Sequence, residues 1–116
     1  MSGLTTHVLD TAQGRPAAGV RVRLFRLDDA GRRLIAETLT NRDGRTDTPL
    51  LSSDEMESGT YEIEFHIGPY FAMSGLADER PFLDVVPVRI GIGDVSGHYH
   101  IPLLACPWSY STYRGK

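Results

Sequence analysis

Cysteine is almost missing from this sequence, and two kinds of segment are missing altogether. The 116 residues contain one cysteine, Cys106, so no disulfide can close within the chain and no cysteine-rich zinc site can be built. The N-terminal residues lack a basic region followed by an apolar run, so we expect no secretory signal. No stretch approaches the roughly 20 apolar residues that span a bilayer. The cytoplasm is therefore the simplest expected location, since a lone cysteine is compatible with reducing surroundings.

Positive charge is too sparse and too scattered to predict nucleic-acid binding. Twelve Lys and Arg residues are set against 15 Asp and Glu, which gives a formal net charge of -3. The densest basic group, Arg21, Arg23 and Arg26, falls in an alternating segment and is interpreted as one solvated strand face. Apolar residues make up 41%, as in ordinary globular domains, and the length favours a single domain over residues 1–116.

A period of two dominates the sequence and predicts β-strands. Tyr61, Ile63, Phe65 and Ile67 alternate with charged or polar residues, the pattern of a strand with one buried and one solvated face. The same pattern, with turn signals rich in Gly, Asp and Ser between segments, predicts further strands. These candidates are residues 4–10, 20–24, 33–40, 82–90, 98–106 and 109–114.

One segment departs from this period. Residues 69–76 begin with a proline and have Gly75 near their end, which predicts about two helical turns. Residues 53–56 predict another single turn. Seven or eight short strands with at most one short helix predict an all-β fold, an antiparallel sandwich or barrel.

Histidine and arginine are the residues best suited to chemistry here. His98 and His100 are two apart in a predicted strand, so their side chains share one face of the sheet. His7 lies in the first predicted strand, and Arg45 follows an Asp-Gly turn. Imidazole exchanges protons near neutral pH, and guanidinium binds a planar edge through two parallel hydrogen bonds. This set suits chemistry on an anionic planar substrate.

The pattern alone leaves other interpretations open. A His-x-His pair on a strand is more often a solvent-facing pair than a site. The pair could also supply two ligands of a zinc ion with His7 as the third, but no carboxylate pattern completes a familiar metal motif. We therefore expect no bound metal and no cofactor.

Three segments carry a resemblance to the 5-hydroxyisourate hydrolases. The first covers residues 4–10 (LTTHVLD) and 14–20 (GRPAAGV), and the second covers residues 40–45 (TNRDGR). The third covers residues 98–104 (HYHIPLL), Pro107 and residues 110–115 (YSTYRG). These blocks lie at the start, middle and end of the chain, so the resemblance spans essentially all of it.

The resemblance implies a transthyretin-like fold, with two four-stranded antiparallel sheets and one short helix. It also implies a homotetramer whose sites lie in a channel at the dimer–dimer interface. The strand count and the single helix expected from periodicity agree with this architecture.

The resemblance further implies an activity without a cofactor: hydrolysis of 5-hydroxyisourate to 2-oxo-4-hydroxy-4-carboxy-5-ureidoimidazoline in urate breakdown. By motif, His7 and His100 would orient or deprotonate the attacking water. Arg45 would hold the substrate and disfavour imidazolium. His98 would support these residues from the same face of the sheet and contact the substrate.

The C-terminal motif implies substrate contacts from Tyr113, Arg114, Gly115 and Lys116. The family pattern usually ends in Tyr-Arg-Gly-Ser, so Lys116 replaces a serine. Two alternatives remain: a non-catalytic protein that binds small ligands, as transthyretin does, and an inactive relative of the hydrolases. The fold does not distinguish an active hydrolase from these two alternatives, because all three share it. The polar set of His7, Arg45 and His100 favours the hydrolase.

Overall fold

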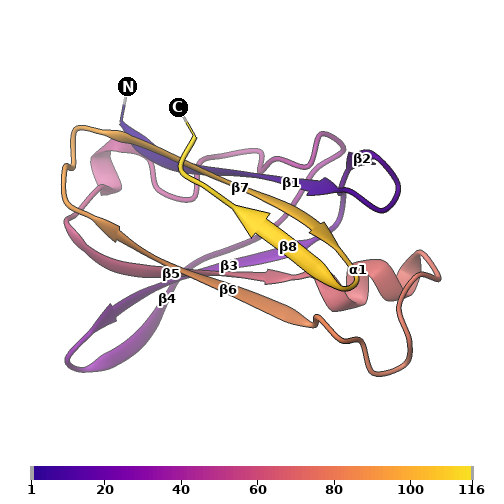
Figure 1. Cartoon of the computed structure of the whole chain (residues 1–116). Coiled ribbons are helices and arrows are strands. Elements are labelled where there is room, and N and C mark those ends of the chain that lie inside the picture. Colours follow the sequence, from indigo (N-terminus) through magenta and orange to yellow (C-terminus); the bar gives the residue numbers. More distant parts are fainter. Residues whose placement is uncertain (1, 116) are drawn as a thin grey trace.

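A computed structural model describes residues 2–115, whose strands form two stacked sheets (Figure 1). In chain order the elements are β1 (Gly3–Asp10), β2 (Arg15–Pro16), β3 (Arg21–Asp28), β4 (Gly31–Leu39), a 3-10 turn η1 (Ser53–Glu55), β5 (Gly59–His66), α1 (Ile67–Met73), β6 (Val85–Ile92), β7 (His98–Cys106) and β8 (Ser109–Thr112). One sheet has the order β2-β1-β7-β8 and the other β4-β3-β5-β6. The predicted all-β sandwich of two four-stranded sheets with one short helix is confirmed for these residues.

The expectation of purely antiparallel sheets is wrong for one pair of strands. β1 runs parallel to β7, with Thr5 beside His100 and His7 beside Pro102. Strands joined by a tight hairpin must run antiparallel. The whole second sheet separates β1 from β7 in sequence, so no turn dictates their relative direction. The period of two predicts which face of the sheet each side chain lies on, but it does not predict whether neighbouring strands run parallel or antiparallel.

The core fills the space between the sheets with the apolar half of each alternating strand. Leu4 and Val8 of β1 meet Ile63 and Phe65 of β5 in one buried cluster. In β7 the intervening residues His98 and His100 are only half-buried and point to the other face. The polar half of β1 and β7 is therefore displayed on the outer face of the β2-β1-β7-β8 sheet.

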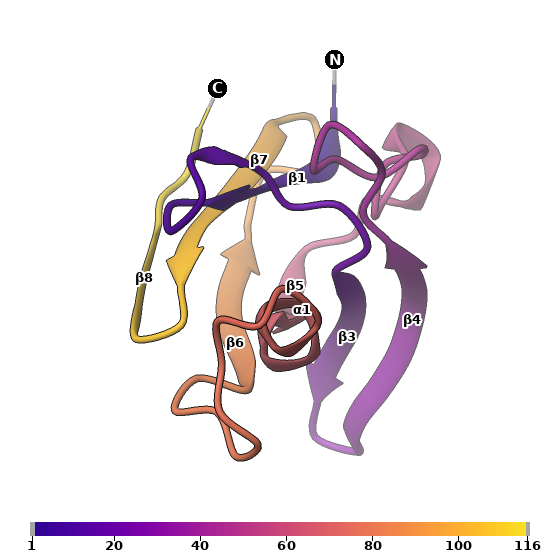
Figure 2. The ribbon, with the colours of Figure 1, turned by 90° about the vertical axis from the view of Figure 1, so that its right-hand side faces the viewer.

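The helix α1 closes one end of the sandwich, and Figure 2 views it end-on. It begins two residues before the predicted start, so Pro69 lies in the first turn, where its missing N–H is not needed. It ends at Met73, three residues before the predicted end, and the φ of +73° at Gly75 permits the amides of Gly75 and Leu76 to bond the Ala72 and Phe71 carbonyls. No helix among the described residues is long and apolar enough to cross a membrane.

Several boundaries differ from the predicted ones. The strand expected at residues 82–90 is β6, which begins at Val85, because Phe82 lies in the preceding loop with 78% of its surface exposed. The strand expected at residues 109–114 ends at Thr112. The strand expected at residues 33–40 begins earlier, at Gly31.

The interpretation of Arg21, Arg23 and Arg26 as one strand face is also wrong in part. Arg21 and Arg23 both bond Glu37 on the outer face. Arg26 is three residues beyond Arg23, so the period of two turns it to the opposite face. There its Nη1 donates to the buried Tyr61 hydroxyl at 2.6 Å.

Candidate functional site

Two parallel imidazole rings stand side by side on the outer face of the β2-β1-β7-β8 sheet. The rings of His98 and His100 are stacked with an interplanar angle of 8° and centroids 6.5 Å apart. Both come from β7, as the sequence predicted. The register with β1 puts Thr5 beside them, and its Oγ1 lies 2.8 Å from His100 Nδ1 and 3.4 Å from His98 Nε2.

A tight loop brings Arg45 to the same face. Asn41 organises this loop, since its Oδ1 accepts hydrogen bonds from the amides of Asp43 (2.9 Å) and Arg45 (3.2 Å). Gly44 has a φ of +77°, and its carbonyl accepts a 2.7 Å hydrogen bond from the amide of Val8 in β1. The loop is therefore attached to the strand that carries His7. The local Asn-x-x-Gly turn over residues 41–44 therefore positions Arg45 at the site.

His7 sits at the junction of strand and loop. It forms an isolated antiparallel bridge with Arg45. Its Nε2 lies 2.8 Å from the carbonyl oxygen of Asp43. That oxygen can only accept, so Nε2 carries a proton and Nδ1 of the neutral ring keeps its lone pair. The structure thus brings His7, Arg45 and His100 together, from segments far apart in the chain.

A cleft of about 390 Å³ opens between the histidines and this loop, within the range for small-molecule sites. Its lining residues are Thr5, Thr6, Arg45, Thr46, Asp47, Thr48, Pro49, His98 and His100. The side chains along this wall carry hydroxyl, guanidinium, carboxylate and imidazole groups. Such a lining can orient a polar ligand through several hydrogen bonds.

The environment of His100 favours its neutral form. Burial lowers the pKa of His100 below its usual range, and the positive charge of Arg45 lowers it further, followed by His7 and His98. Each of these effects disfavours imidazolium. A neutral imidazole can accept a proton or donate one hydrogen bond without a net charge, as acid–base chemistry near pH 7 requires.

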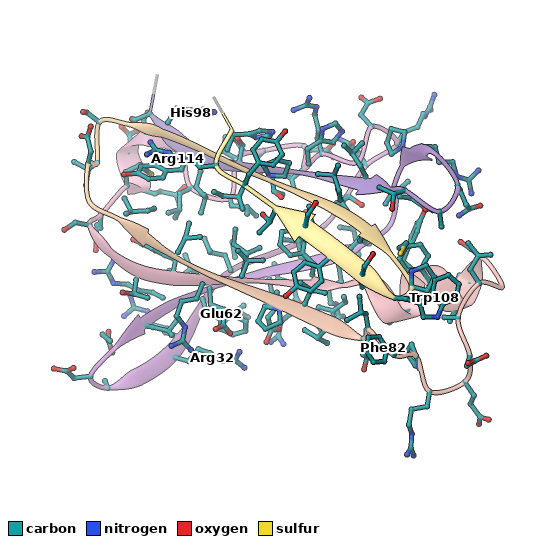
Figure 3. The ribbon with its side chains drawn as sticks, in the orientation of Figure 1. Arg32, Glu62, Phe82, His98, Trp108 and Arg114 are labelled. Carbon is teal, nitrogen blue, oxygen red and sulfur yellow. The ribbon has the colours of Figure 1, made fainter. Side chains whose placement is uncertain are left out.

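The C-terminal segment returns to the same strand, but within the described residues the side chains of Tyr113 and Arg114 do not line the cleft. The amide of Gly115 donates to the His100 carbonyl at 2.6 Å. The Arg114 guanidinium lies 4.0 Å from the centroid of the Tyr99 ring and donates to the His98 carbonyl at 3.2 Å. Figure 3 shows Arg114 beside His98. Tyr113 is exposed, and Lys116 lies outside the described residues.

Within residues 2–115 no three His, Cys, Asp or Glu side chains gather closely enough to hold a metal ion. His98 and His100 are adjacent, yet His7 turns its Nε2 to the Asp43 carbonyl and does not complete a triad.

Two parts of the site were missed in the sequence. Thr5 was not singled out, although its position two residues before His7 places both on one strand face. The parallel β1–β7 register that brings Thr5 to His100 has no sequence signal. The Asp43 carbonyl that accepts from His7 is a backbone group, which every residue has, so residue identity could not predict its role.

Comparisons with known proteins agree with this fold. Residues 4–115 match the model of the HIUase/Transthyretin family. The 5-hydroxyisourate hydrolase of Deinococcus radiodurans is 58% identical over 114 residues, which cover 98% of this chain and 96% of the relative. Fold and cleft together define a transthyretin-like β-sandwich with a histidine–arginine site. The chain belongs to the HIUase/Transthyretin family.

Solved structures place two kinds of protein on this fold. The structure of Klebsiella pneumoniae 5-hydroxyisourate hydrolase matches with a TM-score of 0.83 and 34% identity, covering 100% of both chains. Transthyretin from Sparus aurata matches with a TM-score of 0.87 and 27% identity, covering 99% of this chain and 97% of that one. The fold therefore serves both an enzyme and a transthyretin, and the residues in the cleft must distinguish the two.

Proposed function

We propose that this chain is a cofactor-free hydrolase that converts 5-hydroxyisourate to 2-oxo-4-hydroxy-4-carboxy-5-ureidoimidazoline in urate breakdown. The observation that carries the proposal is that Arg45 and His100, from distant segments of the chain, line one polar cleft, and that the backbone of His7 bridges that of Arg45. The 58% identity to a 5-hydroxyisourate hydrolase over nearly the whole length supports the same reaction.

The chemistry follows from the groups around the cleft. Arg45 binds a planar edge of the substrate through parallel hydrogen bonds. A neutral imidazole takes a proton from water, whose oxygen adds to the ring carbonyl carbon. The carbon–nitrogen bond then breaks, nitrogen takes up a proton, and the carbonyl carbon becomes the carboxylate of the product. Donors around the cleft, including the Arg45 guanidinium, stabilise the oxyanion formed on the way.

The alternative is a non-catalytic protein that binds small ligands in the same channel. An apolar ligand prefers a lining of aliphatic and aromatic side chains. Here the lining includes three threonines besides Thr5, together with Arg45, Asp47 and two histidines. This polar lining favours the hydrolase.

A coupled assay tests the proposal. Urate and urate oxidase generate 5-hydroxyisourate, whose ultraviolet absorbance decay is followed with and without the protein. We expect decay that accelerates in proportion to protein and is unchanged by a chelator. Decay no faster than the spontaneous reaction would leave a binding protein, and loss of rate with chelator would contradict the metal-free mechanism.

We also propose a homotetramer with sites at the dimer–dimer interface, and a cytoplasmic location. All four residues of the edge strand β8 are exposed, and β6 is the edge of the other sheet, so both present backbone groups to a second copy. Trp108 and Phe82 lie beside these edges with 66% and 78% of their surface exposed (Figure 3). Burial against a partner removes this apolar surface from water.

Light scattering after gel filtration tests the assembly. Trp108→Asp and Phe82→Asp should lower the measured mass, because each charge would be buried at a subunit contact. Leu39→Asp is the matched control, since Leu39 is 60% exposed on β4, away from these edges. A wild-type protein of monomeric mass would contradict the tetramer, as would mass loss in the control alone. Fractionation of the source cells tests the location.

A further inference from the structure

A single hydroxyl group connects two of the three histidines in the site. Thr5 Oγ1 lies 2.8 Å from Nδ1 of His100 and 3.4 Å from Nε2 of His98. A threonine hydroxyl has one hydrogen to donate and two lone pairs to accept with. It can donate to only one imidazole, so at least one of the two rings donates to it, and donating to the other ring satisfies its own hydrogen. The direction of this chain decides which nitrogen of His100 carries a proton.

The surroundings of His98 fix that direction. His98 Nδ1 is buried and has no hydrogen-bond partner within residues 2–115. A buried N–H without an acceptor costs more than a bare lone pair, and such groups are rare in proteins. The proton of His98 is therefore on Nε2, which faces Thr5. Thr5 accepts that hydrogen and turns its own toward Nδ1 of His100. His100 is left with its proton on Nε2.

His7 has the complementary arrangement. Its Nε2 donates to the Asp43 carbonyl at 2.8 Å, so its Nδ1 lone pair is available to accept a proton. One histidine of the site is thus set to accept and the other to donate. In His100 the proton is on Nε2, and the only lone pair, on Nδ1, accepts the hydrogen bond from Thr5. No lone pair is left to take a proton from water, so His100 cannot share the role of base with His7.

We propose that Thr5 is a positioning residue that relays a hydrogen bond from His98 and so holds His100 as a donor, leaving His7 as the general base. His100 Nε2–H then contributes a hydrogen bond to the carbonyl or leaving nitrogen of the substrate, while water loses its proton to His7 Nδ1. This inference rests on the proposed hydrolase activity. It extends that activity by assigning opposite tasks to two histidines.

Nitrogen NMR of the intact protein tests the tautomers without any substrate. In wild type at pH 7.5, His100 should show a protonated Nε2 and an unprotonated Nδ1. Thr5→Val keeps the shape of the side chain and removes the hydroxyl, so His100 should become a mixture of tautomers. Thr5→Ser should restore the wild-type spectrum. A wild-type His100 with its proton on Nδ1 would overturn the inference.

Kinetics supply the second readout. Thr5→Val should lower kcat by about tenfold, the loss expected for one oriented hydrogen bond, with KM changed less than about twofold. Thr5→Ser should recover most of the rate, and Thr60→Val, the same change on exposed Thr60 of the other sheet, should have no effect. Full activity of Thr5→Val with intact fold would overturn the inference.

The two proposals fail differently. If wild type does not hydrolyse 5-hydroxyisourate but His100 has the assigned tautomer, the function is wrong and the Thr5 relay stands as a feature of the site. If hydrolysis is observed and the spectrum shows the opposite tautomer, the function stands and the division of roles between His7 and His100 is wrong.

Discussion

Asn41 and Arg45 close a loop on each other through two backbone-directed hydrogen bonds. The amide of Asn41 donates to the Arg45 carbonyl at 2.7 Å, and the amide of Arg45 donates to Asn41 Oδ1 at 3.2 Å. The Asn41 Nδ2 also donates to Asp47 at 2.9 Å. One side chain therefore shapes the segment that carries the arginine of the site, without touching the cleft itself.

Replacing Asn41 should impair substrate binding through this loop. In Asn41→Ala the amides of Asp43 and Arg45 lose their side-chain acceptor, so Arg45 is held less firmly. We expect KM to rise by about three- to tenfold, since each lost hydrogen bond is worth about 1 kcal/mol, with a smaller change in kcat. Asn41→Asp keeps the acceptor oxygen and should behave closer to wild type. Equal KM for Ala and wild type would show that the loop holds its shape without this side chain.

Gly44 should be intolerant of any side chain. Its φ of +77° is costly for other residues, and an added Cβ would meet the Val8 carbonyl oxygen at 2.3 Å. Gly44→Ala should therefore destabilise the protein by more than about 2 kcal/mol and impair the site. Gly14→Ala is the matched control, because Gly14 has a φ of +68° with nothing within 4 Å of the added Cβ. Urea unfolding of both variants isolates the contact with β1 as the difference between them.

The acid limb of the activity profile should respond to Arg45. Burial and then Arg45 lower the pKa of His100, so this ring stays neutral to a lower pH than an ordinary histidine. The hydrogen bond from Thr5 needs an unprotonated Nδ1 on His100, so activity that depends on this arrangement is present above the lowered pKa of His100 and is lost as pH falls through it. Arg45→Gln removes the second cause and should move this limb to higher pH, besides lowering the rate. A limb that stays in place in Arg45→Gln would contradict the electrostatic coupling, and His100 chemical shifts followed against pH provide the direct check.

Asp10 and Tyr70 should stabilise the end of the sandwich away from the site. The Asp10 side chain is 1% exposed and accepts from the amides of Ala12 and Gln13, from Gln13 Nε2 and from the Tyr70 hydroxyl of α1. Burial acts to raise the pKa of Asp10, but these hydrogen bonds, Tyr70 first among them, bring it below its usual range. Tyr70→Phe should cost about 1–2 kcal/mol at pH 7.

The pH dependence of that cost distinguishes a carboxylate contact from simple packing. Because the folded pKa of Asp10 is lowered, its contribution is fully present above the unfolded value of 3.8 and is lost as pH falls through the folded value. The stability difference between wild type and Tyr70→Phe should therefore shrink in acid. Urea unfolding at pH 7 and near pH 3 measures it, and a difference independent of pH would assign the effect to packing alone.

Arg114 should act through its planar group. It lies over the Tyr99 ring and donates to the His98 carbonyl, so it holds the C-terminal segment against β7. Arg114→Lys keeps the charge but loses the planar stacking, and we expect it to weaken substrate binding nearly as much as Arg114→Ala. Full rescue by lysine would instead favour direct attraction of an anionic substrate. KM values of the two variants, measured at low and high salt, separate these roles.

The sequence by itself determined which residues face the core and which face outward. The alternation in residues 4–10 and 98–106 put His98 and His100 on one face, because the strand period is a local property of the backbone. The Asn-x-x-Gly turn before Arg45 and the helix around Pro69 are also local, since φ preferences and caps act over a few residues.

Only the tertiary structure decided which segments meet. The parallel register of β1 on β7 puts Thr5 beside His100, and the Gly44 carbonyl on Val8 brings the arginine loop to His7. That Arg114 contacts substrate stays a prediction; within the described residues its guanidinium lies over the Tyr99 ring and donates to the His98 carbonyl. These contacts join residues distant in sequence, many of them through backbone atoms. These contacts stabilise the protein only after the distant segments have come together, so no local sequence pattern predicts them.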